Sequence, residues 1–143
     1  FELPAPPAQV RMLNPVGLAL LKLVAWEDRQ SNPIARRKHV VDLISLIQYY
    51  IHPLNKHRLL AGNDSDIADA EDDALFAGAR LLGRDLARLA SQPGITRISA
   101  LISKNAGRSG RCELARDMRN LLGGSFDTAI HLLLAMQRGL QGP

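Results

Sequence analysis

The sequence predicts an all-α protein of about six helices, in which a helical hairpin precedes a small bundle. Forty-six per cent of the 143 residues are hydrophobic, so most of the chain is expected to fold around a core. Aromatic residues make up only 4%, so this core must consist mainly of Leu, Ile, Val and Ala. Apolar residues also recur at helical spacing, and Asn-Pro pairs and glycines stand where helices would begin and end.

The N-terminal segment 1–13 has three of the chain's eight prolines in its first nine residues, and such a segment does not form a helix. We expect an extended arm here, or a short strand over Val10–Leu13 that ends an N-terminal α/β half. Because the chain starts at Phe1 and not at a methionine, we also expect further sequence upstream.

A helical hairpin is predicted at 14–62. Asn14-Pro15 and Asn32-Pro33 each place an asparagine, a good helix cap, before a proline, which loses no hydrogen bond at the first helical position. A proline then ends the second helix, and a glycine follows a short turn of helix. The expected helices are 15–29 and 33–51, and the short turn at 54–60 is not counted among the six.

A small bundle is predicted at 66–140. A proline and a glycine are expected to stop its long first helix, and Ser125 is expected to cap its last helix. Hairpin and bundle together form the predicted helical domain 14–143. The expected helices of the bundle are 67–90, 95–104, 112–122 and 126–140.

Charge is unevenly distributed along the chain, whose net charge is +4. The segment 64–73 holds six of the 14 acidic residues, which leaves 18 basic residues against 8 acids elsewhere. A basic surface of this kind attracts a polyanion such as RNA or a nucleotide, although ordinary solvated helix faces give the same composition. The D-x-D formed by Asp64 and Asp66 is interpreted as helix capping, because no strand or Gly-Ser precedes it.

Several classes of function find no support in the sequence. The longest apolar run is interrupted by a lysine, so we expect no membrane span. The single cysteine, Cys112, excludes an internal disulfide and fits a cytoplasmic protein. No metal site is predicted, because no histidine has a close ligand spacing with this cysteine or with a carboxylate. The histidines are His39, His52, His57 and His131.

Two charged residues lie inside apolar runs of the predicted hairpin. Lys22 stands among leucines and Asp42 lies between Val41 and Leu43, where a charge is unfavourable unless it meets a partner. Because the two helices are antiparallel and joined by a short turn, we expect an ion pair between Lys22 and Asp42. Two interpretations stay open: a buried pair that fixes the helix register, or a lysine that meets a phosphate at the edge of a cleft.

The segment 22–29 reads K-L-x-A-W-x-D-R, and a basic run and the pair Asp42-Leu43 follow it. This pattern resembles the AbiEii-type nucleotidyltransferases, which are toxin-like members of the polymerase-beta-like superfamily. The stretch 78–87 is similar to the downstream helical region of uncharacterised relatives in that family. His39 stands where the family often has an acidic residue.

The resemblance implies roles for four residues. Lys22 and Asp42 are the expected catalytic pair, with Lys22 on the triphosphate and Asp42 orienting Lys22 or assisting the acceptor. Lys22, Arg29 and Lys38 are the expected nucleotide-binding residues.

The metal-binding part of that family's active site has no counterpart in this sequence. The resemblance implies a Gly-Ser followed by D-x-D or D-x-E, whose carboxylates hold Mg²⁺. The single Gly-Ser, at Gly124, is followed only by Asp127. We therefore expect Mg²⁺ and catalysis only when an N-terminal half is joined to this chain, and no transfer by this chain alone.

The leading hypothesis is thus the helical C-terminal part of a nucleotidyltransferase-like protein that helps to bind a nucleoside triphosphate. The alternative is a non-enzymatic helical module that binds RNA or a partner protein, such as an antitoxin-like protein. The nucleotide, the acceptor, a toxin–antitoxin pairing and the oligomeric state stay open.

Overall fold

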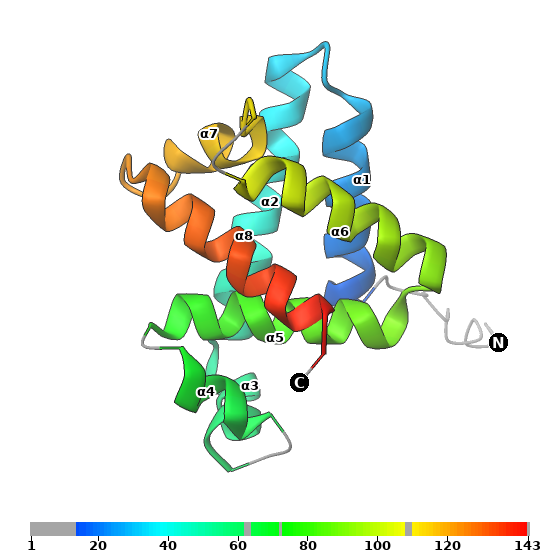
Figure 1. Cartoon of the computed structure of the whole chain (residues 1–143). Helices are drawn as coiled ribbons and strands as arrows, with labels where there is room; N and C mark the ends of the chain where they lie inside the picture. Colours follow the sequence, from blue (N-terminus) through cyan, green and yellow to red (C-terminus); the bar gives the residue numbers. More distant parts are fainter. Residues whose placement is uncertain (1–13, 62–63, 72, 108–109, 143) are drawn as a thin grey trace, which may run out of the picture.

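A computed structural model describes residues 14–61, 64–71, 73–107 and 110–142. Within these ranges the chain forms eight α-helices and no strand, so the all-α prediction is confirmed and the expected number of six helices is too low (Figure 1). The arm or strand expected within 1–13 lies outside the described residues. None of the described helices is long and apolar enough to cross a membrane.

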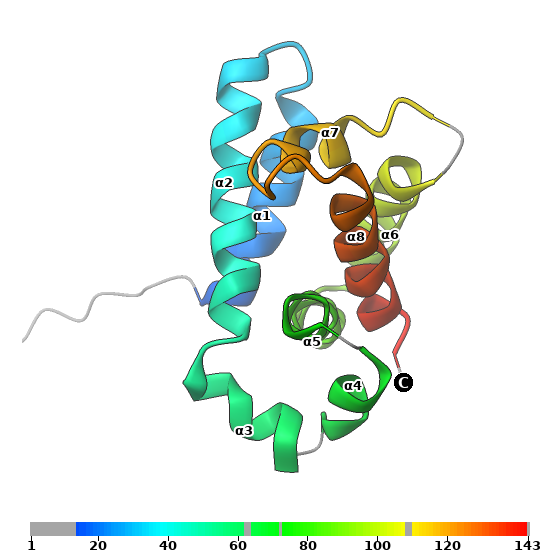
Figure 2. The same ribbon diagram turned by 90° about the vertical axis from the view of Figure 1, so that its left-hand side faces the viewer.

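Helices α1 (Pro15–Asp28) and α2 (Pro33–Tyr50) form the predicted hairpin and run antiparallel to each other (Figure 2). The side chain of Asn14 accepts a hydrogen bond from a backbone N–H in the first turn of α1 at 2.7 Å, and Asn32 caps α2 in the same way. Each cap satisfies an N–H that the helix itself leaves unpaired, so both helix starts are determined locally. The short α3 (Pro53–Ala61) follows.

The predicted single helix over 67–90 is wrong, because the chain divides there into α4 (Ser65–Ala70) and α5 (Ala74–Leu89). Glu71 and Asp73 both adopt extended backbone conformations, which interrupts the helix. The Asp73 carboxylate accepts a hydrogen bond from a backbone N–H of α5 at 2.7 Å and thereby caps the second helix.

The last three helices differ from expectation mainly at their ends. The helix expected at 95–104 begins earlier, since Pro93 occupies the first turn of this helix instead of separating two helices. The helix expected at 112–122 ends earlier, and two glycines with positive φ angles carry the chain through the following turn. Ser125 caps the last helix as predicted. These helices are α6 (Gln92–Ala106), α7 (Glu113–Arg119) and α8 (Phe126–Leu140).

Helices α5 and α8 pack against each other at very close range. A Cβ atom on Gly83 would lie 2.1 Å from the carbonyl oxygen of Met136, and one on Gly139 would lie 2.0 Å from that of Arg80. A side chain therefore fits at neither contact, and the two backbones themselves touch. One hydrophobic core joins hairpin and bundle and includes Leu23, Leu43, Leu82, Leu114 and Leu132.

Candidate functional site

The two charged residues singled out from the sequence meet across the hairpin. Lys22 of α1 and Asp42 of α2 form an ion pair with 2.5 Å between Nζ and Oδ2. Their side chains are 22% and 46% exposed, so the expected pair is present but lies at the surface and not beneath the core. Because exposed ion pairs contribute little to stability, fixing the helix register is the weaker of its two interpretations.

An open groove adjoins this ion pair on the outer face of the hairpin. Its volume is about 360 Å³, and most of the residues around it are apolar. The pair therefore presents a cation to a groove that is open to solvent, although Asp42 already neutralises the charge of Lys22. The other residues of the wall are Pro15, Leu18, Ser45, Leu46 and Tyr49.

The other two predicted binding residues lie elsewhere on the hairpin. Arg29 and Lys38 line a second depression of about 440 Å³, beside the turn that joins α1 to α2. Both side chains are exposed, and neither forms an ion pair with any residue that the structure describes. Along α1, two helical turns or about 10 Å separate Lys22 from Arg29. The four predicted residues thus form two neighbouring sites on one hairpin.

The tryptophan of the K-L-x-A-W pattern belongs to the interior. The Trp26 indole N–H donates to Asp117 at 2.9 Å, and the Arg36 guanidinium lies 5.6 Å from the ring centre. Arg36 also forms ion pairs with Asp117 and Glu113, at 2.7 and 2.9 Å, which fasten α7 to the hairpin. Local spacing could not reveal this cluster, because 77 and 81 residues separate Arg36 from its two carboxylate partners.

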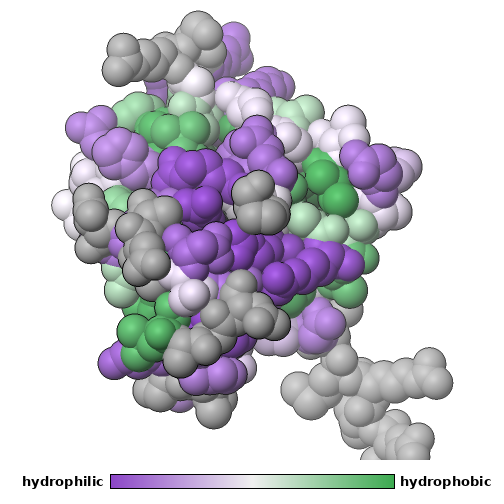
Figure 3. All heavy atoms as spheres, turned by 60° about the horizontal axis from the view of Figure 1, so that its bottom comes forward, coloured by the Kyte–Doolittle hydropathy of each residue, from purple (hydrophilic) through white to green (hydrophobic). Residues whose placement is uncertain are grey.

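The interpretation of Asp64 and Asp66 as helix-start residues is confirmed for their positions, since Asp64 is the N-cap of α4 and Asp66 lies in its first turn, but both carboxylates bind arginines. Arg84 makes a bidentate contact with Asp66, at 2.8 and 2.7 Å, and also reaches Asp64 at 3.1 Å. Arg58 and Arg88 bind Asp64 as well, and that side chain makes no capping hydrogen bond to the described part of α4. Arginines thus engage Asp64 and Asp66, and Arg138 likewise binds Glu71 at 2.7 Å; hydrophilic side chains gather on this end of the molecule (Figure 3).

These arginines keep the two carboxylates ionised. Burial acts to raise the pKa of Asp64, but hydrogen bonds from Arg58 and Arg84 outweigh burial and hold this pKa below its usual value. The hydrogen bond from Arg84 likewise lowers the pKa of Asp66. Within the described ranges, no group of three or more His, Cys, Asp or Glu side chains is arranged to hold a metal ion.

The fold and the site define an all-helical protein with an open, charged groove on its hairpin. Comparisons of the chain with known protein families, with curated proteins and with solved structures find no match. The resemblance of the hairpin sequence to nucleotidyltransferases therefore stays a prediction.

Proposed function

We propose that this chain is the helical part of a nucleotidyltransferase-like protein and that its hairpin helps to bind the triphosphate of a nucleotide. The observation that carries the proposal is the Lys22–Asp42 pair, which faces an open groove and not the core. A lysine held by a carboxylate is a positioned cation, and a phosphate oxygen can take the place of the carboxylate as its partner.

The two residues of the pair have opposite effects on an anion in the groove. Phosphate oxygens compete with Asp42 for Lys22 Nζ, so Asp42 both positions the lysine and limits the affinity of the groove. Arg29 and Lys38 lie nearer the turn and carry charges that no ion pair within the described residues neutralises. Their field attracts a polyanion toward the hairpin.

Nucleotidyl transfer requires more than this hairpin. In our proposal the paired carboxylates that bind Mg²⁺ belong to an N-terminal half, and this chain contributes nucleotide binding but no transfer on its own. Asp64 and Asp66 do not serve as that pair, because arginines engage both of them.

A calorimetric titration with ATP, ADP and AMP tests the proposal. Binding through the phosphates predicts that affinity falls in the order ATP, ADP, AMP, and that added salt weakens it because the contact is electrostatic. Equal affinity for ATP and AMP would contradict the proposal, since the base and not the phosphates would then hold the nucleotide.

A second candidate function is a non-enzymatic module that binds a partner protein. It is favoured by exposed apolar side chains on the same hairpin, namely those of Leu21, Ile34, Val41 and Tyr49. Tyr49 also lines the groove, and exposed apolar patches mark interaction surfaces. Val41→Gln separates the two candidates, because it should weaken docking of a protein on the hairpin without adding a charge beside Asp42, and so should leave the affinity for ATP nearly unchanged.

A further inference from the structure

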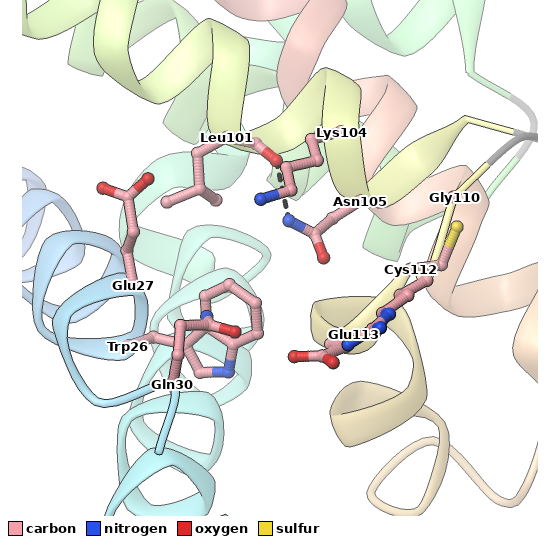
Figure 4. A pocket seen from close by; sticks show the side chains of 10 residues that line it. Trp26, Glu27, Gln30, Leu101, Lys104, Asn105, Gly110, Cys112 and Glu113 are labelled. Carbon is pink, nitrogen blue, oxygen red and sulfur yellow. Dashed lines mark hydrogen bonds between the residues drawn. The ribbon is translucent and has the colours of Figure 1, made fainter. Parts of the chain in front are cut away.

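A cavity away from the hairpin groove lies between the end of α1, helix α6 and the start of α7 (Figure 4). Its volume is about 470 Å³, within the range of roughly 300–1,000 Å³ that is common for small-ligand sites. It is larger than both hairpin depressions and shares no wall residue with either of them. It is therefore a separate feature of the molecule.

Hydrogen bonds hold the wall of this cavity in place. Asn105, which is 5% exposed, donates from Nδ2 to the Leu101 carbonyl and accepts at Oδ1 from the Leu114 N–H, both at 2.9 Å. This side chain ties α6 to α7 and keeps its own polar atoms paired. Leu101 and Trp26 are apolar parts of the wall, but each residue is only 3% exposed, so they offer a ligand only a small apolar surface. A ligand thus meets a preformed site, which favours binding because little of the protein has to be ordered.

The charged side chains of the cavity wall differ in whether they have ion-pair partners. Each of its two carboxylates is engaged by an arginine that does not line it, with ion-pair distances of 2.8 Å for Glu27 and 2.9 Å for Glu113. Lys104 and Arg111 also line the cavity, and neither forms an ion pair with any part of the chain that the structure describes. The four charges of the wall sum to zero, but both acids already have arginine partners, so Lys104 and Arg111 are the side chains that can bind a negatively charged group.

We propose that this cavity binds a small organic anion, namely a carboxylate or a phosphate ester with a single apolar ring. The negative group binds Lys104 and Arg111, whose side chains are exposed at the cavity, and the ring lies over the small apolar surface that Leu101 and Trp26 leave open. This site does not depend on nucleotide binding at the hairpin, since the two share no wall residue.

Trp26 allows a direct test, because it is the chain's single tryptophan and lies in the cavity wall. We expect phenyl phosphate and phenylacetate to change its fluorescence saturably, and the better of the two identifies the preferred anion. Each should bind at least about tenfold more tightly than inorganic phosphate or benzyl alcohol, which carry only the charge or only the ring. The proposal is overturned if neither aromatic anion gives a saturable change, or if benzyl alcohol binds as tightly as both.

Two substitutions test the argument from charge. Lys104→Gln and Arg111→Gln change exposed side chains, so both variants should fold. Each should weaken phenyl phosphate binding about tenfold, as expected for the loss of one charge-assisted contact. Lys56→Gln removes one positive charge from α3, at the other end of the molecule, and should leave the affinity unchanged. An equal loss in all three variants would overturn the proposal, because net charge alone would then explain binding.

Discussion

The guanidinium of Arg84 and the carboxylate of Asp64 lie 3.1 Å apart, and their side chains are only 6% and 4% exposed. The pair joins α5 to the start of α4, a helix of six residues that is too short to be stable on its own. Because a buried ion pair is favourable only while both partners are present, this end of the fold depends on each of the two residues.

We expect Asp64→Ala to lower the free energy of unfolding by about 3 kcal/mol, because Arg84 then remains buried without one of its carboxylates. Urea denaturation measures the change. Asp28→Ala is the matched control, since it removes an exposed carboxylate from the ion pair with Arg97 and should cost less than about 1 kcal/mol. Equal losses in the two variants would show that the burial of Asp64 has no special effect.

Stability should fall in acid. The folded-state pKa values of Asp64 and Asp66 lie below their usual value. Their contribution is therefore present above the unfolded-state pKa of about 4, and it is lost as the pH falls through the folded-state values. Urea denaturation should give nearly constant stability from about pH 7 to pH 5 and lower stability at about pH 3. Asp64→Asn should reduce this acid-dependent loss, and an unchanged loss would assign it to other carboxylates.

The close contact between α5 and α8 predicts that Gly139→Ala destabilises the protein by about 2 kcal/mol, because the added methyl group meets the backbone at Arg80. The melting temperature measures this effect. Gly94→Ala is the control, since its Cβ would make only an ordinary contact, 3.5 Å from the Ala90 Cβ, and alanine favours helix. An unchanged melting temperature for Gly139→Ala would mean that the two helices separate easily.

Three helix starts could be predicted from this sequence because their signals are local. Asn14, Asn32 and Ser125 each cap the helix that begins at the next residue, as expected. The break before α5 could not be predicted, because the acids near Asp73 suit a helix N-terminus at several positions. Which of them caps a helix and which binds an arginine depends on tertiary contacts such as that of Arg84.

In the candidate site, too, the local features could be predicted from the sequence and the features that depend on tertiary contacts could not. A short turn fixes which residues of the hairpin face each other, and this made the contact between Lys22 and Asp42 predictable. The cavity beside Trp26 could not be predicted, because Lys104 and Arg111 reach its wall from α6 and the segment before α7, far along the chain.

The central claim is that Lys22 binds phosphate in the hairpin groove while Asp42 limits this binding. The most direct measurement is the affinity for ATP of Lys22→Gln and Asp42→Asn beside the unchanged protein, determined by calorimetry at low salt. We predict opposite shifts: about tenfold weaker binding for Lys22→Gln and about fivefold tighter binding for Asp42→Asn. Shifts in the same direction, or no shift in either variant, would contradict the claim.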